Sequence, residues 1–168
     1  MNGQSPNVPA GENDAAVPWR GRLLGIDYGT VRIGVSVSDL FQKLASPLHN
    51  YHRVSQTEDQ RFFRKQVHEY QVAGFVVGLP LHMNGDESDK SREARGYGKW
   101  LHSITQLPVT FQDERLSSAQ AEVLLRTEDL TRRQRKARID KLAAQIVLQT
   151  WLDRRANSST ETEERHLF

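Results

Sequence analysis

The sequence predicts an α/β fold with a five-stranded mixed sheet flanked by helices, the first three strands forming an antiparallel meander. Three observations predict it. Residues 23–38 alternate apolar with small or polar side chains in two runs joined by a tight Tyr-Gly-Thr step, the pattern of a β-hairpin. The apolar run 74–79 follows a helical pattern, as a buried parallel strand does. From Ile139 onward, apolar residues at helical spacing indicate a helix that packs on the sheet.

Length and composition limit the organisation of the chain. Its 168 residues suffice for one domain with a core and are too few for two domains of ordinary size. We expect a folded domain at 19–155 between a disordered N-terminal tail, 1–18, and a polar C-terminal tail, 156–168. The chain has no cysteine, which excludes disulfides and thiolate metal sites. It also has no run as long as a membrane span and no signal pattern, so we expect a cytoplasmic protein.

The elements that follow the hairpin can be assigned in order. A third strand is predicted over 44–51, where Pro47 favours an edge position or a bulge. Ser55 followed by Glu58 matches a helix capping box, and helical spacing then predicts a helix over about 56–70. The buried strand at 74–79 comes next.

The second half of the chain continues the alternation of helices and strands. The pattern predicts a loop over 81–86, a polar helix over 87–104, a strand over 107–111, a helix through 119–125 capped by Ser117 or Ser118, and the last helix. Gly96 and Gly98 weaken the helical pattern where they occur. Three strands followed by helix, strand, helix, strand and two helices is the order of a ribonuclease H-like fold.

Three acids stand where different elements could bring them together. Asp27 ends the first strand, Glu114 lies just past the fifth, and Asp140 stands at the start of the last helix. Carboxylates that share a cleft repel one another unless a cation neutralises them, and oxygen ligands of this kind suit Mg²⁺ or Mn²⁺. Ala143 and Ala144 are small enough to let the helix lie close to the sheet. The three acids together favour a metal site able to hydrolyse a phosphodiester.

Each acid also has an ordinary explanation when taken singly. Asp27 could be a turn carboxylate that accepts from a backbone N–H group. Glu114 could pair with Arg115, and Asp140 could be an acid stabilised by the dipole at a helix N-terminus. The six histidines show no metal-ligand spacing, although His82 lies in the loop at 81–86.

Basic residues indicate a polyanion partner. The formal net charge is only +2, but acids are concentrated in the terminal segments, so the folded body is more basic. The best candidate for a phosphate-binding surface is the basic run from 126 to 141, with a solvated connection as the alternative. Its expected contacts are Arg132, Arg133, Arg135, Lys136, Arg138 and Lys141. Arg115, which could instead hold Glu114, and Asn84, which could simply form an Asn-Gly turn, are further candidates.

Four sequence blocks resemble the YqgF family, whose members are regarded as Holliday-junction resolvases or as nucleases of precursor 16S ribosomal RNA. The blocks are Leu24-Gly25-Ile26-Asp27-Tyr28-Gly29 with Arg32-Ile33-Gly34-Val35-Ser36, Val77-Gly78-Leu79-Pro80-Leu81 with Asn84-Gly85, Asp113-Glu114-Arg115-Leu116-Ser117-Ser118, and Ile139-Asp140 with Ala143-Ala144. The resemblance implies a ribonuclease H-like fold. It also implies that Asp27, Glu114 and Asp140 are the catalytic carboxylates and metal ligands.

The leading hypothesis is therefore a metal-dependent endonuclease that acts on ribosomal RNA precursor as a monomer or weak homodimer. A four-way DNA junction is the alternative substrate. The sequence does not separate it from the RNA, because both nucleic acids present similar phosphates. A non-catalytic RNA-binding module is a third possibility. Asp27-Tyr28-Gly29-Thr30 also resembles the phosphate turn of actin-like and sugar-kinase ATPases, but those enzymes close two such domains around a nucleotide and this chain has the length of one.

Overall fold

The computed structural model of the chain describes residues 13–116 and 131–165. Its sheet has five strands, β1 (Arg22–Asp27), β2 (Arg32–Ser38), β3 (Ala45–His52), β4 (Val72–Leu79) and β5 (Val109–Asp113), in the order β3-β2-β1-β4-β5. The pairs β1–β2 and β2–β3 are antiparallel, whereas β1–β4 and β4–β5 are parallel. The mixed sheet with an antiparallel meander is thus confirmed. The helix expected through 119–125 lies outside the described residues.

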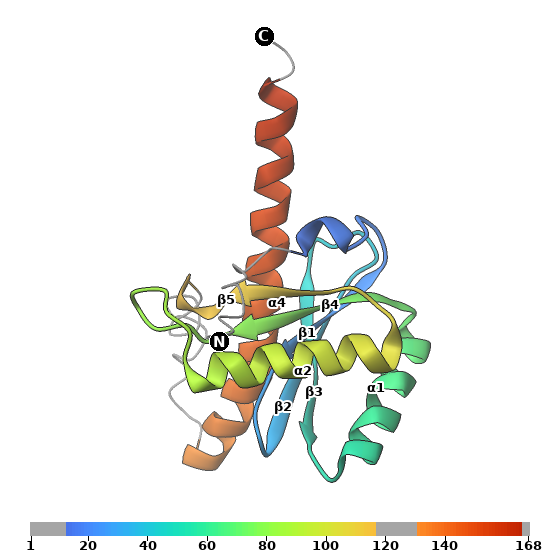
Figure 1. Cartoon of the computed structure of the whole chain (residues 1–168), viewed down its shortest axis with the longest axis vertical. Helices are drawn as coiled ribbons and strands as arrows, with labels where there is room; N and C mark the ends of the chain where they lie inside the picture. The colour runs from blue at the N-terminus through green and yellow to red at the C-terminus, as the bar shows by residue number, and fades with distance from the viewer. Residues whose placement is uncertain (1–12, 117–130, 166–168) are drawn as a thin grey trace, which may run out of the picture.

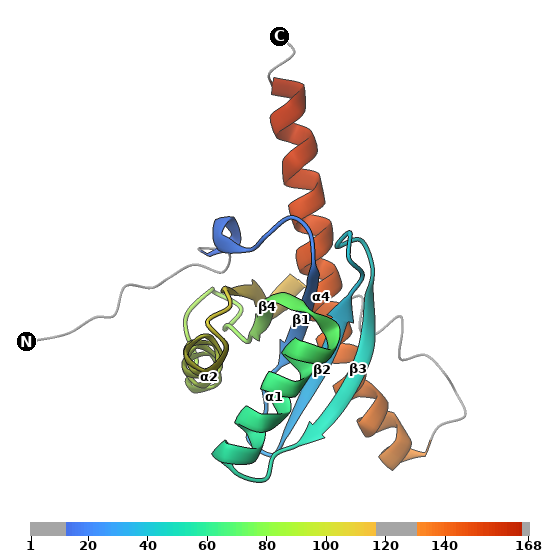
Figure 2. The ribbon, with the colours of Figure 1, turned by 90° about the vertical axis from the view of Figure 1, so that its right-hand side faces the viewer.

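Helices cover both faces of the sheet. The helices are α1 (Gln56–Tyr70), α2 (Asp89–Thr105) and α4 (Arg132–Arg165), with short 3-10 turns η1 (Asp14–Ala16) and η2 (Glu114–Leu116). Helices α1 and α2 lie on one face and α4 on the other, which makes three layers (Figure 1, Figure 2). No helix within residues 13–116 and 131–165 combines the length and apolarity needed to cross a bilayer.

The period-two pattern of β1 divides the core between these layers. Leu24 and Ile26 belong to the larger core cluster, which contains Phe63 of α1 and Leu101 of α2. Leu23 belongs to the second cluster, which α4 closes with side chains such as Trp151. Alternate residues of β1 therefore face opposite helical layers, as the sequence pattern predicted.

Local signals account for the edges of the elements. The Ser55 side chain accepts from the backbone N–H of Glu58 at 3.2 Å, so α1 begins where the sequence predicted. Strand β3 is an edge strand, and its pairing with β2 shifts register at Pro47, so both expectations about this proline are confirmed. Helix α2 continues through Gly98, where packing against β5 leaves no room for a side chain. A Cβ at Gly98 would lie 2.7 Å from the ring of Phe111 in β5.

Helix α4 is longer at both ends than the sequence predicted. It begins at Arg132 instead of near Ile139, and it continues to Arg165 through the segment expected to be a polar tail. Extending a helix that is already nucleated costs little, even for a polar sequence. The hydroxyls of Ser158 and Ser159 also donate to the carbonyls four residues earlier, both at 3.0 Å. The C-terminal part of α4 projects beyond the sheet (Figure 2).

Part of the predicted N-terminal tail is packed on the fold. The Asp14 carboxylate accepts from Trp151 Nε1 at 2.8 Å and from Thr110 Oγ1 at 2.5 Å, and it pairs with Arg154 at 2.8 Å. Val17 is buried, and its carbonyl accepts from Arg155 Nη2 at 2.6 Å. The expectation of a tail up to residue 18 is therefore wrong for residues 14–18, because the carboxylate of Asp14 and the buried Val17 have partners far along the chain. Residues 1–12 lie outside the described part.

Helix α4 lies close to the sheet at Gly25. A Cβ at this position would overlap Ser36 Oγ and lie 2.6 Å from Leu148 Cβ and 2.9 Å from the carbonyl oxygen of Ala144. Ser36 stands opposite Gly25 in the β1–β2 pair and donates to that same carbonyl at 2.7 Å. The sequence prediction that small residues let the last helix lie close to the sheet is confirmed.

Replacing Gly25 with alanine tests this approach. We expect Gly25→Ala to lower the free energy of unfolding by about 1–3 kcal/mol, because the added methyl group forces α4 away from the sheet. Gly96→Ala is the matched control, since a Cβ there meets no atom within 4 Å and alanine favours the helix, so its stability should rise by up to about 1 kcal/mol. Urea unfolding of both variants measures the difference, and equal stabilities would contradict the described packing.

Candidate active site

Two acids meet on the α4 face of the sheet. Asp27 ends β1, and it stands two residues after Gly25 and so on the same face of the strand. Glu114 begins η2 immediately after β5. Its carboxylate occupies the space over Gly78 of β4, because a Cβ built at Gly78 would overlap Glu114 Oε1. The same Cβ would lie 2.9 Å from Val147 Cγ2 of α4. The sheet therefore brings together the carboxylates of Asp27 and Glu114, as the sequence predicted.

Both carboxylates line one cavity of about 320 Å³ at the carboxyl ends of the parallel strands. Ligands of open α/β sheets bind at this edge. The lining comprises Asp27, Tyr28, Gly29, Thr30, Gly78, Pro80, Lys90, Glu93 and Glu114. The turn after β1, the end of β4 and the first turns of α2 thus surround the two acids.

The sequence analysis did not identify the contribution of α2. Lys90 and Glu93 lie in its first turns and reach the cavity. Their position could have been found from the helical period, because the buried residues Ala94 and Tyr97 stand one turn further along the same side of the helix and Leu101 two turns. Lys90 adds a positive charge to a site whose other ionisable groups are acids.

The pKa of Glu114 is raised by its surroundings. Burial, followed by the negative charges of Asp27 and Asp113, raises the pKa of the Glu114 carboxyl to about 7. The positive charge of Lys90 lowers the pKa of Glu114, but by less than the other causes raise it. At neutral pH the protein is thus divided between a state in which Glu114 is charged and one in which Glu114 holds a proton. A divalent cation would relieve the repulsion between the negative charges.

The donor set suits a hard cation. Carboxylate oxygens are the ligands that Mg²⁺ and Mn²⁺ prefer, and Asp27 and Glu114 supply them from two elements. Within the part of the chain whose side chains are described, no group of three His, Asp or Glu side chains can hold a metal ion. Asp140 belongs to α4, but its side chain lies outside that part. The described residues therefore supply two of the three carboxylates that the sequence predicted for a metal site, and metal binding stays a prediction.

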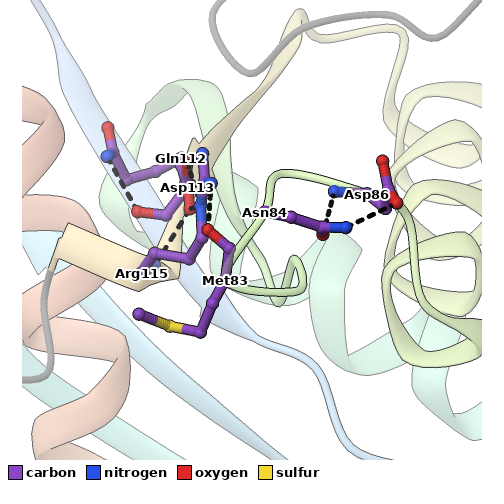
Figure 3. A network of polar contacts seen from close by, with 6 residues as sticks. All are labelled: Met83, Asn84, Asp86, Gln112, Asp113 and Arg115. Carbon is purple, nitrogen blue, oxygen red and sulfur yellow. Dashed lines mark hydrogen bonds and ion pairs between the residues drawn. The ribbon is translucent and has the colours of Figure 1, made fainter.

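Arg115 holds the turn that carries Glu114, but it does so through a different acid. Its Nε donates to Asp113 Oδ2 at 2.9 Å and its Nη2 to the same oxygen at 2.5 Å (Figure 3). The sequence analysis had considered Glu114 as the partner, and this alternative is wrong because the side chain turns back toward β5. Burial alone would raise the pKa of Asp113, but the hydrogen bonds and the charge of Arg115 lower it below its ordinary value.

The loop after β4 is tied to the same arginine. Arg115 Nη1 donates to the carbonyl of Met83 at 3.2 Å (Figure 3). Asn84 folds back on its own loop, because its Nδ2 donates to Asp86 Oδ2 at 2.7 Å and its Oδ1 accepts from the Asp86 backbone at 3.1 Å. This is the ordinary turn that the sequence offered as an alternative. Nucleic-acid contacts by Asn84 and Arg115 stay a prediction.

The basic run is only partly described. Arg132, Arg133 and Arg138 are exposed on the first turns of α4. The side chains of Arg135, Lys136 and Lys141, and residues 126–130, lie outside the described part. The run is helical from residue 132 instead of forming a connection up to Ile139, and its phosphate contacts stay a prediction.

Comparisons with known proteins agree with this architecture. A family model described as RuvX, Holliday junction resolvase, matches residues 21–154. A Rhodobacter capsulatus protein named "Putative pre-16S rRNA nuclease" is 43% identical over 143 residues, which are 85% of this chain and 90% of that protein. A Rhodopirellula baltica protein with the same name is 44% identical over 137 residues, or 81% and 79% of the two chains.

A solved structure supports the fold. RuvC from T. thermophilus, determined in complex with a Holliday junction substrate, matches with a TM-score of 0.51 at 18% identity. The match covers 82% of this chain and 96% of that one. The ribonuclease H-like fold expected from the order of elements is confirmed.

The pKa of Glu114 predicts a specific dependence of stability on pH in the absence of metal. The folded protein keeps a proton on Glu114 between pH 4.5, the ordinary pKa of this carboxyl, and about pH 7, where the unfolded chain has released it. The free energy of unfolding therefore falls as the pH rises through this window, by on the order of 2 kcal/mol. We expect Glu114→Gln to remove this fall, as measured by urea unfolding at pH 5, 6, 7 and 8 with a chelator present.

The exposed Glu69 on α1 provides the control for that measurement. Glu69→Gln should lose stability with rising pH in parallel with the parent protein. A Glu114→Gln curve that also runs parallel to the parent would show that burial and the neighbouring charges do not raise the pKa of Glu114.

Proposed function

The chain belongs to the RuvX family, described as Holliday junction resolvase, and we propose that it is a metal-dependent endonuclease that hydrolyses phosphodiester bonds of nucleic acid. The observation that carries the proposal is the pair of carboxylates, Asp27 and Glu114, in one cavity at the carboxyl end of the sheet. We propose 16S ribosomal RNA precursor as the substrate, since the similar proteins of R. capsulatus and R. baltica are named for it.

Asp27 and Glu114 would hold the metal, with Asp140 as a third ligand. Residue 140 precedes Ala144 by four positions in α4, which is about one helical turn. Ala144 packs over Gly25, two residues before Asp27, and this spacing along α4 supports the proposal for residue 140. Magnesium or manganese bound there would activate water and stabilise the departing oxygen of the phosphodiester.

Other residues of the chain would position the substrate. Lys90 is the cavity's basic residue and can bind a phosphate oxygen beside the acids. Outside the cavity, we propose that the basic run at the start of α4 binds the nucleic-acid backbone through contacts that salt weakens. The exposed members that the structure describes are Arg132, Arg133 and Arg138.

A four-way DNA junction is the second candidate substrate. The description of the family favours it, because the RuvX model is named for Holliday junction resolution. Both substrates present phosphates to the same kind of site, so the two proposals share the carboxylates and differ only in the nucleic acid that is cut.

Replacing one carboxylate oxygen tests the proposal. We expect Asp27→Asn to lower the rate of cleavage at least about 100-fold, because the amide is a poorer ligand for a hard cation, while the melting temperature in chelator stays the same or rises. The assay follows cleavage of 16S ribosomal RNA precursor and of a four-way DNA junction side by side, with Mg²⁺, with Mn²⁺ and with chelator.

Asp153→Asn is the matched control, since Asp153 is an exposed acid on α4 that accepts from Gln149 in the same helix. It should cut as the parent does. Faster cutting of the RNA supports the ribosomal substrate, whereas cutting of the junction alone supports the resolvase. Metal-independent cutting, or equal rates for Asp27→Asn and the parent, would contradict the mechanism. Binding without any cleavage would indicate a non-catalytic RNA-binding module.

A further inference from the structure

A second cavity of about 390 Å³ adjoins the carboxylate cavity. Tyr28 and Glu93 line both cavities, so the two are neighbours across these side chains. The second lining comprises Tyr28, Arg53, Gln56, Glu93, Gly96, Tyr97 and Trp100. Its volume is enough for the ring system of one nucleobase.

The walls of this cavity are aromatic. The ring centroids of Tyr28 and Tyr97 are 4.8 Å apart, and those of Tyr97 and Trp100 are 5.0 Å apart, with interplanar angles of 37° and 35°. The hydroxyl of Tyr97 is buried and has no hydrogen-bond partner in the described part of the chain, so the side chain offers no polar group to the cavity. Tyr97, which is 7% exposed, thus lies between the rings of Tyr28 and Trp100, and Tyr28 directly follows Asp27 in the chain.

A guanidinium group is fixed against the same rings. Arg53 Cζ lies 5.6 Å from the centroid of Tyr28 and 5.5 Å from that of Tyr97. Its Nε pairs at 2.8 Å with Asp59, which is 1% exposed and also accepts from the Tyr51 hydroxyl at 2.9 Å. The planar group therefore has a set orientation before any ligand arrives, which reduces the entropy lost on binding.

Packing alone does not account for this arrangement. Trp100 and Tyr28 are only half-buried, and Gly96 leaves the space beside them open, because a Cβ there would meet no atom within 4 Å. A glycine inside a helix costs stability relative to alanine. At Gly98, by contrast, the ring of Phe111 fills the space that a side chain would need. Exposed Gln56 and Glu93 add hydrogen-bonding groups at the rim.

We infer that this aromatic cavity binds one unpaired nucleobase of the strand whose phosphate lies in the neighbouring carboxylate cavity. Unpaired bases bind proteins by stacking on aromatic rings and on arginine planes, and their edges bond to side-chain amides and carboxylates. A base held in a duplex is stacked between its neighbours and cannot enter. The position of the phosphate rests on the proposed function, but the binding of the base does not.

Filling the cavity tests the inference. We expect Gly96→Leu to weaken binding of a short single-stranded RNA that contains 2-aminopurine by about tenfold or more, because the new side chain takes the place of the base. The parent protein should quench the 2-aminopurine fluorescence of the single strand and leave that of the matching duplex unchanged. All binding is measured in chelator, where no cleavage occurs.

Ser103→Leu is the matched control, because it places the same side chain on an exposed position of α2 outside the cavity. It should bind and quench as the parent does. The melting temperature of Gly96→Leu should be equal to or above that of the parent, since leucine favours the helix, so weaker binding cannot be attributed to unfolding.

The outcomes separate this inference from the proposed function. Loss of quenching in Gly96→Leu alone supports the base site, whether or not the parent protein cuts any substrate with metal. Absence of quenching by the parent, or equal quenching and affinity in Gly96→Leu, overturns the base site even if Asp27→Asn abolishes cleavage. If the parent cuts, slower cutting by Gly96→Leu supports the placement of the phosphate beside the base, and an unchanged rate overturns that placement.

Discussion

The hydrogen bond from Ser36 Oγ to the carbonyl of Ala144, at 2.7 Å, fixes the distance between α4 and the sheet. It exists because Gly25, opposite Ser36, has no side chain to hold the helix away. The same depth of packing brings Val147 against Gly78, where the carboxylate of Glu114 lies. Two glycines on neighbouring strands thus admit the helix and the acid, and the cavity follows from that close contact.

Adjacent residues at the end of β5 meet opposite electrostatic conditions. The carboxylate of Asp113 is held by the guanidinium of Arg115, so its pKa lies below the ordinary value. Glu114, the next residue, turns to the other side, where burial and the charge of Asp27 raise its pKa to about 7. The turn η2 therefore separates an acid that stabilises the local backbone from one that faces the cavity, and Arg115 orients Glu114 only indirectly.

Most of the sheet and part of the site could be predicted from the sequence, because they depend on local patterns. Period-two alternation places Asp27 on the face of Gly25, and the capping residue Ser55 fixes the start of α1. Features that depend on distant partners, or on how a turn is arranged, could not be predicted. Asp14 bonds to Trp151, far along the chain, and the choice of Asp113 by Arg115 depends on how η2 turns. The position of Lys90 at the cavity, by contrast, could have been found from the helical period of α2.

The segment that begins at Asn13 also changes how the molecule can meet other chains. Strand β5 is at the edge of the sheet, and an edge strand offers backbone groups on which a foreign strand can add. Asn13 Nδ2 donates to the carbonyl of Val109 at 3.2 Å, and Asp14 binds the hydroxyl of Thr110 beside it. The segment therefore works against strand-to-strand aggregation at the edge next to the site, and it does so with side chains instead of an added strand.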